Sequence, residues 1–161
     1  NKSAFPGEGR LVFPMGQMEA MRTGLEQRFD QGLQRIELLL QENQLKMSAL
    51  FRNQKLEVEN GRRLTVAGDS PLLPLVKVTP NHANQPPGAA ALQDLQQPVP
   101  IGTRLPDLSF FPAAGISRAA LIGLTVAQIN DLEWFYNEGF PGQNASERRD
   151  SVLGFLTGRV Q

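Results

Sequence analysis

Few side chains in this sequence have the types and spacing that catalysis requires. Nucleophilic catalysis needs a base beside a hydroxyl or thiol group, yet the chain has no cysteine and a single histidine, His82, in a Pro- and Asn-rich segment. General acid–base catalysis needs carboxyl groups that act together. Glu57 and Glu59, like Asp131 and Glu133, are two residues apart, so on a helix they point away from each other. The sequence therefore predicts a non-enzymatic protein with no catalytic residue.

The sequence also lacks the residues that metal and cofactor sites require. Zinc sites are built from cysteine and histidine, and one histidine without cysteine cannot supply such a set. Gly7-Glu-Gly9 lacks the third glycine or the Lys-Ser/Thr pair of a phosphate-binding loop. We expect neither a metal nor a cofactor.

Two features suit a binding surface. Arg148 and Arg149 form a basic pair, and Trp134, the only tryptophan, begins a Trp-Phe-Tyr cluster. These three residues are candidate contacts for a nucleic acid or another partner. However, residues 117–161 carry four basic and five acidic side chains, a net charge of −1, whereas DNA binding requires several phosphates to be neutralised at once. The alternatives are surface salt bridges for the arginines and a core position for the aromatic cluster, with one ring partly exposed.

Composition excludes several classes of protein. Among 161 residues, 16 basic side chains balance 16 acidic ones, which excludes a polybasic nucleic-acid wrapper or an acidic tail as a description of the whole chain. No apolar run reaches the roughly 20 residues of a transmembrane helix, and no secretory signal is visible. We expect an intracellular location, in cytoplasm or nucleus, with no membrane partner. The chain begins at Asn1 rather than Met, so we expect further residues upstream.

Composition also divides the chain into four parts. Residues 1–14 are a flexible arm, 15–63 a long amphipathic helix, 64–116 a Pro-rich extended segment and linker, and 117–161 a helix–loop–helix head. Nine of the 12 prolines lie in residues 71–116, and proline keeps the preceding residue out of a helix. The predicted fold is all-α, with a coiled-coil-like N-terminal helix.

The long helix carries an apolar stripe with an eleven-residue period, which is 3.67 residues per turn and gives a nearly straight or slightly right-handed seam. A helix over residues 15–60 is about 65–70 Å long, too long to bury its stripe on its own chain. We therefore expect a homo-oligomer. The predicted interface comprises Met18, Leu25, Phe29, Leu33, Ile36, Leu40, Met47 and Phe51.

Three glycines complicate this helix. Gly16, Gly24 and Gly32 are eight residues apart, and each costs about 1 kcal/mol relative to alanine in a helix. They predict either fraying of the first half or a face that lets another helix approach closely.

The sequence Asn60-Gly61 allows two structures. It suits a hairpin turn that pairs residues 55–59 with 62–66, or a helix that continues to or through Gly61. The hairpin would place its apolar residues on opposite faces, which favours the helix. The apolar strip at residues 71–80 should then lie in a groove on the helices.

The head should contain short capped helices. Ser117 caps a helix at 118–122, and Thr125 with Gln128 forms a capping box that opens a helix at 126–138, ended by Gly139. Asn144 or Ser146 caps a helix at 147–157, although Asn144-Ala-Ser146 also fits a glycosylation acceptor. Residues 89–95 form a short helix in the linker. One face of the 126–138 helix carries Val126, Ile129, Leu132 and Phe135 or Tyr136, and the inward positions of the 147–157 helix are Val152, Phe155 and Leu156.

Three stretches of the head resemble a SAP-type module: Leu-Thr-Val-Ala-Gln-Ile-Asn-Asp-Leu at 124–132, Gly-Phe-Pro-Gly at 139–142, and Arg-Arg-Asp-Ser-Val-Leu-Gly-Phe-Leu at 148–156. That family usually binds DNA through basic groups at its helix ends and loop. The resemblance implies such a role for Arg148 and Arg149.

A second resemblance covers about residues 45–157. It rests on Arg52-Asn53, Asn60-Gly-Arg-Arg63, Pro-Leu-Leu-Pro-Leu-Val-Lys at 71–77, Phe111-Pro112 and the C-terminal helices. These are similar to a fungal domain family defined by the C-terminal domain of a meiotically up-regulated yeast protein, and the motifs have low specificity. The resemblance implies a helical, non-enzymatic protein.

Two functional hypotheses follow. The first is a structural or interaction protein that self-associates through its long helix. The second is a SAP-like nucleic-acid-binding module on a coiled-coil stalk.

Overall fold

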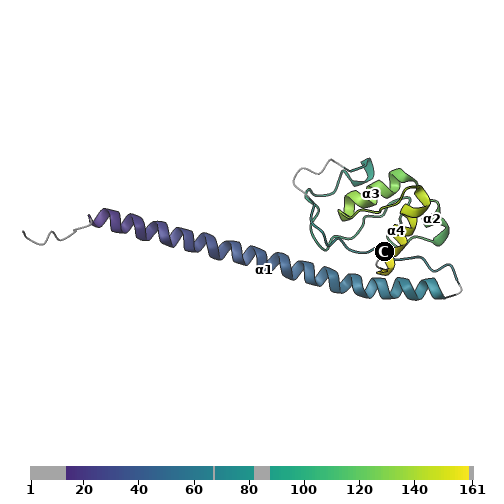
Figure 1. Ribbon diagram of the computed structural model, residues 1–161, viewed down its shortest axis with the longest axis horizontal. Helices are drawn as coiled ribbons and strands as arrows, with labels where there is room; N and C mark the ends of the chain where they lie inside the picture. Colours follow the sequence, from purple (N-terminus) through teal and green to yellow (C-terminus); the bar gives the residue numbers. More distant parts are fainter. Residues whose placement is uncertain (1–13, 67, 82–87, 160–161) are drawn as a thin grey trace, which may run out of the picture. The chain divides into compact units, whose positions relative to one another are not determined.

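The computed structural model describes residues 14–66, 68–81 and 88–159 (Figure 1). It contains α1 (Met15–Thr65), a short 3-10 helix η1 (Ala90–Leu92), α2 (Arg118–Ile122), α3 (Val126–Tyr136) and α4 (Ala145–Thr157). The predicted all-α fold is confirmed, and the described residues contain no strand beyond two isolated antiparallel bridges. Most of the predicted arm, together with Gly7-Glu-Gly9 and His82, lies outside the described residues.

The chain divides into two compact units, Asn1–Gln41 and Glu42–Gln161. Helix α1 contributes to both. In the described part of the first unit, residues 14–41 are helical from residue 15, and none of them is buried. In the second unit, Leu56 and Leu64 of α1 pack against a hydrophobic core that the segments after the helix form.

Helix α1 continues through Asn60 and Gly61, so the hairpin alternative is wrong. The helix begins directly after Pro14, whose carbonyl accepts the N–H of Gln17 at 2.9 Å. Its last turn carries Arg62 and Arg63, which complement the negative end of the helix dipole. Glu59 stabilises this end, because its carboxylate pairs with both arginines at 2.9–3.0 Å.

The apolar strip predicted at residues 71–80 lies against the helices, as expected, and Leu73 and Val76 bond to α1. Two buried asparagines of α1 hold it. The carboxamide of Asn53 donates to the carbonyl of Val76 at 2.8 Å and accepts the N–H of Val76 at 2.7 Å. Asn60 makes the same pair of bonds with Leu73, at 2.9 and 2.7 Å, and also donates to the carbonyl of Leu156 in α4.

The other backbone groups of the strip pair with later segments. Leu72 and Ile116 exchange both of their N–H···O bonds at 2.8 Å, and Lys77 bonds through its N–H to Thr103 and through its carbonyl to Gly102. Leu75 accepts a bond from the hydroxyl of Tyr136 at 2.9 Å. A proline-rich segment can be buried only if its polar backbone groups find such partners.

The predicted caps of the head are confirmed. Ser117 accepts the N–H of Ala120, Thr125 and Gln128 form a reciprocal capping box, and Asn144 accepts the N–H of Glu147. Of the two predicted caps for α4, Asn144 is the one used, so its carboxamide stabilises the helix start. The linker helix predicted near 89–95 is the 3-10 turn η1.

Two predictions about α3 are wrong. The helix ends at Tyr136 rather than 138, and its left-handed C-cap is Asn137, with φ 51°, rather than Gly139. Asparagine tolerates this conformation, and the Asn137 carboxamide donates to the carbonyl of Pro80 at 2.8 Å. On the predicted shared face, Ile129 and Leu132 are buried, whereas Val126, at the first position of the helix, is 46% exposed.

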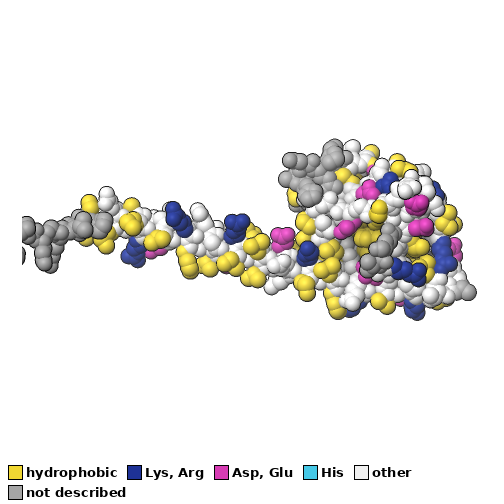
Figure 2. Space-filling model, in the orientation of Figure 1, with side chains coloured by type: hydrophobic (Ala, Val, Ile, Leu, Met, Phe, Trp, Pro, Cys, Tyr) yellow, Lys and Arg dark blue, Asp and Glu magenta, His cyan; other side chains and the backbone are white. Residues whose placement is uncertain are grey.

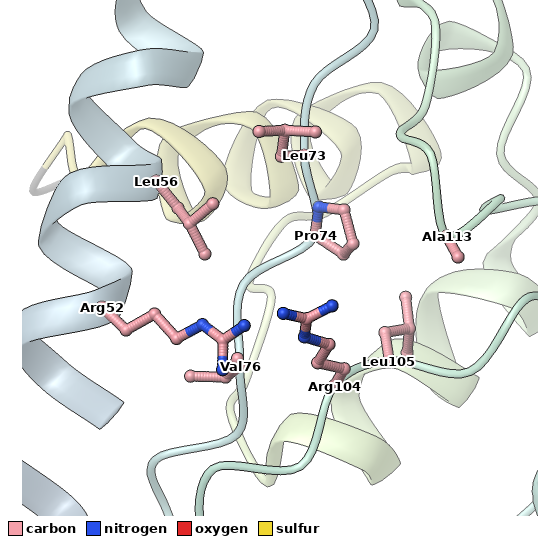
Figure 3. A pocket seen from close by; sticks show the side chains of 8 residues that line it. All are labelled: Arg52, Leu56, Leu73, Pro74, Val76, Arg104, Leu105 and Ala113. Atoms are coloured by element: carbon pink, nitrogen blue, oxygen red, sulfur yellow. The ribbon is translucent and has the colours of Figure 1, made fainter. Parts of the chain in front are cut away.

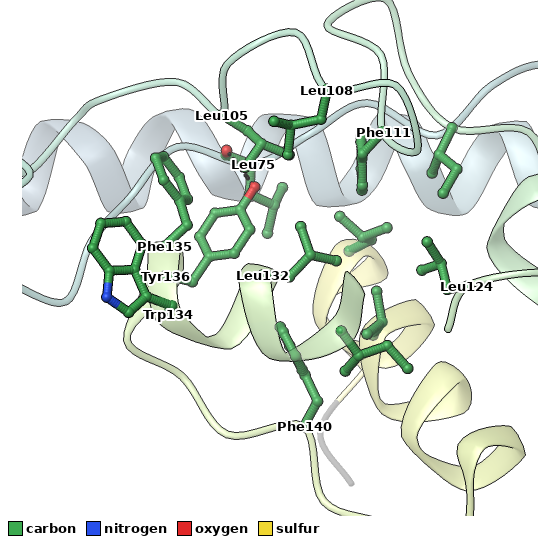
Figure 4. Close-up of a cluster of buried hydrophobic side chains, with 14 of the residues drawn as sticks. Leu75, Leu105, Leu108, Phe111, Leu124, Leu132, Trp134, Phe135, Tyr136 and Phe140 are labelled. Atoms are coloured by element: carbon green, nitrogen blue, oxygen red, sulfur yellow. Dashed lines mark hydrogen bonds between the residues drawn. The ribbon is translucent and has the colours of Figure 1, made fainter. Parts of the chain in front are cut away.

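The core surrounds α3 (Figure 4). Trp134, Phe135 and Tyr136 are 8%, 0% and 2% exposed, so the prediction that one of three consecutive rings would be partly exposed is wrong. The reason is that the Pro-rich segment covers the faces of α3 that the other helices leave open. A Cβ built on Gly88 would lie 2.9 Å from the Trp134 ring, and Tyr136 reaches Leu75.

Candidate functional site

The residues of the predicted oligomer interface all lie on α1 with exposed side chains. Their exposed fractions run from 45% for Leu33 to 68% for Phe29 and Met47. Hydrophobic side chains are visible along this helix in Figure 2. Contiguous apolar surface of this kind usually marks an interaction site.

The glycines of α1 do not share one face. An α-helix turns by about 100° per residue, so each eight-residue step from Gly16 to Gly24 to Gly32 turns the next glycine by about 80°. A Cβ built on any of the three meets nothing within 4 Å. The prediction that these glycines form a single face for close helix approach is therefore wrong.

The C-terminal end of the stripe borders a groove within the second unit. The groove has a volume of about 550 Å³, and Met47, Leu50 and Phe51 of α1 line it together with Val78 and Phe155. It also includes Glu57, whose pKa is raised by burial. Within the second unit, Met47 and Phe51, the last two residues of the stripe, thus line a groove that also contains the carboxylates of Glu57 and Glu138.

Arg148 of α4 is built into the packing of the head. Its guanidinium pairs with Glu133 at 2.9 Å and donates to Asn130 at 2.9 Å and to the carbonyl of Phe140 at 3.0 Å. The Arg148 side chain is only 15% exposed, so the ion pair is partly buried rather than a surface salt bridge. This arginine holds the 139–142 loop against α4.

The other two candidate contact residues are also engaged or covered. Arg149 donates to the carbonyl of Leu124 at 2.8 Å, which ties α4 to the start of α3. Trp134 is 8% exposed and lies in the core (Figure 4). The predicted core position of the aromatic cluster is confirmed, and no flat ring face is offered to a base.

Lys77 is fully buried, and its role was not predicted from the sequence. Its ammonium group donates to the carbonyl of Phe135, one of the last carbonyls of α3, and lies 5.7 Å from the centre of the Phe135 ring. Burial lowers the pKa of Lys77 to about 8, opposed by the nearby Glu138. The only signal in the sequence was a single lysine inside an apolar strip with few other charges.

Asn53 and Asn60 fix the strip, and this role was also not predicted from the sequence. They are 5% and 0% exposed. Their seven-residue spacing places them on the same face of α1, two turns apart. Two asparagines at this spacing, before a proline-rich strip, were the available signal.

The part of the chain that the structure describes contains neither a metal-binding cluster nor a membrane-spanning helix. In residues 14–66, 68–81 and 88–159, no group of three or more His, Cys, Asp or Glu side chains is arranged to hold a metal ion. Over the same residues, no helix has the length and apolarity needed to cross a membrane.

Comparisons with family models, curated proteins and solved structures find no match for this chain. The resemblances to the SAP-type module and to the fungal family therefore stay predictions.

Proposed function

We propose that this protein is a non-enzymatic interaction protein that self-associates through the apolar stripe of α1. The observation that carries the proposal is the exposure of the whole stripe. Every residue of the predicted interface keeps at least 45% of its surface exposed. Burying such side chains against another helix removes apolar surface from water, which favours association by about 25 cal/mol per Å².

A second copy of the chain is the occupant that best suits this stripe. The eleven-residue period nearly matches the turn of a straight helix, so two copies can stay in register over several turns. Residues 15–47 carry five acidic and four basic side chains, and two copies of so nearly neutral a segment repel each other little. Either a parallel or an antiparallel pair of helices is compatible with this period and with this near-neutral charge.

The SAP-like alternative is less well supported. DNA binding needs arginine groups that are free to reach phosphates, whereas Arg148 and Arg149 are engaged with groups of the head. The net charge of −1 over residues 117–161 weighs in the same direction.

The test is the absolute mass in solution, measured by light scattering after gel filtration over a range of concentrations. The interface variant combines Leu33→Glu, Ile36→Glu and Leu40→Glu. The matched control combines Gln27→Glu, Gln31→Glu and Gln34→Glu, which adds the same charge on the opposite side of α1.

We expect the unchanged chain and the control to run as a dimer or larger species, and the interface variant to run as a monomer. A monomer for the unchanged chain at all concentrations contradicts the proposal. So does an interface variant whose mass equals that of the control.

A further inference from the structure

A pocket of about 250 Å³ lies within the second unit, between α1, the strip and the segment at residues 104–113 (Figure 3). Arg52 of α1 and Arg104 line opposite sides of it. Their guanidinium groups point toward one another in Figure 3. Leu56 and Pro74 contribute part of its apolar wall. The pocket therefore combines two cations with an aliphatic surface.

Neither guanidinium has a partner among the described residues, and both side chains belong to exposed residues. Other arginines of this unit donate side-chain bonds: Arg62, Arg63, Arg118, Arg148 and Arg149. Two like charges that face each other without a counter-ion are unfavourable. An anion between them would relieve this repulsion.

The nearby carboxylates do not supply that anion. Asp107, three residues after Arg104, accepts the N–H of Ala113 at 2.9 Å. Glu59, seven residues after Arg52, is held by Arg62 and Arg63. No carboxylate of the described residues lines the pocket. An anion supplied by a binding partner would therefore meet no competing carboxylate among the described residues that line the pocket.

We propose that this pocket binds an acidic side chain of a protein partner, with a neighbouring aliphatic side chain packed on Leu56 and Leu73. The planar fork of arginine matches a carboxylate in a bidentate geometry. A volume of about 250 Å³ is smaller than most small-molecule sites and suits one or two side chains. The inference is independent of self-association through α1.

The experiment is an NMR titration of the isotope-labelled full chain with two capped pentapeptides. One has glutamate at its centre with leucine on either side, and the other has glutamine in place of glutamate. The Nε–Hε signals of Arg52 and Arg104 and the methyl signals of Leu56 and Leu73 report binding. Inorganic phosphate and a single-stranded oligonucleotide are the additional probes.

We expect the glutamate peptide to shift all four groups and to bind at least about tenfold more tightly than the glutamine peptide, with affinity falling as salt is added. Arg52→Gln and Arg104→Gln should each weaken binding about tenfold. The matched control is Arg159→Gln, which removes an exposed arginine of the same unit that does not line this pocket. It should change the affinity less than twofold.

Equal binding of the two peptides overturns the proposal. So does the absence of any shift at the two arginines, or equal weakening by Arg159→Gln. Saturation by phosphate or the oligonucleotide, without a response to the glutamate peptide, also overturns it and assigns the pocket to phosphate instead.

Discussion

Two hydrogen bonds join Asn53 and Val76: the Asn53 carboxamide donates to the carbonyl of Val76 and accepts its N–H. The side chain of α1 thus takes the place that the backbone of a neighbouring β-strand would have. Asn60 and Leu73 repeat the arrangement. The distance between the two asparagines along α1 matches the distance between Val76 and Leu73 along the strip. Seven residues of helix rise about 10.5 Å, and three residues of extended chain span about 10 Å. The strip therefore runs antiparallel to α1 along two equivalent contacts.

Replacing these asparagines should destabilise the second unit. Asn60→Ala leaves the N–H and carbonyl of Leu73 and the carbonyl of Leu156 without their bonds, and we expect a loss of about 3 kcal/mol in the free energy of unfolding. Asn53→Ala removes one bond fewer and should cost about 2 kcal/mol. Urea unfolding followed by circular dichroism measures both values.

The matched control is Gln54→Ala, which truncates an exposed amide in the same turn of α1. It should change the free energy of unfolding by less than about 0.5 kcal/mol. If Asn60→Ala costs no more than this control, the strip is not held by the carboxamides.

The stability of the protein should rise with pH above neutrality because of Lys77. Burial lowers the pKa of Lys77 to about 8 in the folded state, from 10.5. Between these values the unfolded chain holds the proton that the folded chain has lost, so folding becomes more favourable as pH rises. We expect a gain of about 1–2 kcal/mol between pH 8 and 9.5, measured by urea unfolding at each pH.

Lys77→Met is the comparison for this prediction. The substitution removes the titrating group, so the free energy of unfolding of this variant should not rise between pH 8 and 9.5. The variant also leaves the carbonyl of Phe135 without its donor. The measurement is kept below pH 10 because of Tyr136, whose pKa is raised by burial in the folded state. Above that pH the tyrosine ionises in the unfolded chain first, which lowers the stability and would mask the effect of Lys77. Parallel pH profiles for the two proteins would contradict the role given to Lys77.

The helix caps of this fold were predictable from the sequence, whereas the individual hydrogen bonds between distant residues were not. Ser117, Thr125 and Asn144 were recognised as caps, because a cap bonds to a backbone N–H three residues away. Asn53 and Lys77 bond to groups 23 and 58 residues away, and no local pattern specifies those partners.

The dependence on distant segments also explains why the prediction of one partly exposed ring among Trp134, Phe135 and Tyr136 was wrong. Helix periodicity alone leaves one of three consecutive positions facing outward. The Pro-rich segment that covers them has no periodicity of its own, so its path over α3 was not predictable from the sequence. The stripe of α1, which depends only on periodicity, was placed on the helix as expected.

The two arginines of α4 should matter for stability rather than for nucleic-acid binding. The double variant Arg148→Ala/Arg149→Ala removes donors to the carbonyls of Phe140 and Leu124, and we expect a loss of about 2–3 kcal/mol in the free energy of unfolding. The unchanged chain should give no shift of duplex DNA in a gel at about 50 mM salt. A salt-dependent shift that disappears in the double variant would restore the SAP-like alternative.

Gly115 should be the least replaceable glycine beside the strip. Its φ of +120° is unfavourable for other residues, and a Cβ there would lie 2.8 Å from the carbonyl oxygen of Leu72. That oxygen accepts the N–H of Ile116, so relief of the clash must break the bridge between the strip and residue 116. We expect Gly115→Ala to lower the free energy of unfolding by at least about 2 kcal/mol and to speed amide exchange at Leu72 and Ile116.

Gly139→Ala is the control for this substitution, because a Cβ on Gly139 meets nothing within 4 Å and its φ is not in the left-handed range. It should leave the free energy of unfolding within about 0.5–1 kcal/mol of the unchanged chain. Since both variants add one methyl group and remove the same backbone freedom from the unfolded chain, their difference isolates the strain at Gly115. Equal stabilities for the two variants would mean that the strip can shift away from residue 115 at little cost, and that the asparagine contacts alone set its path.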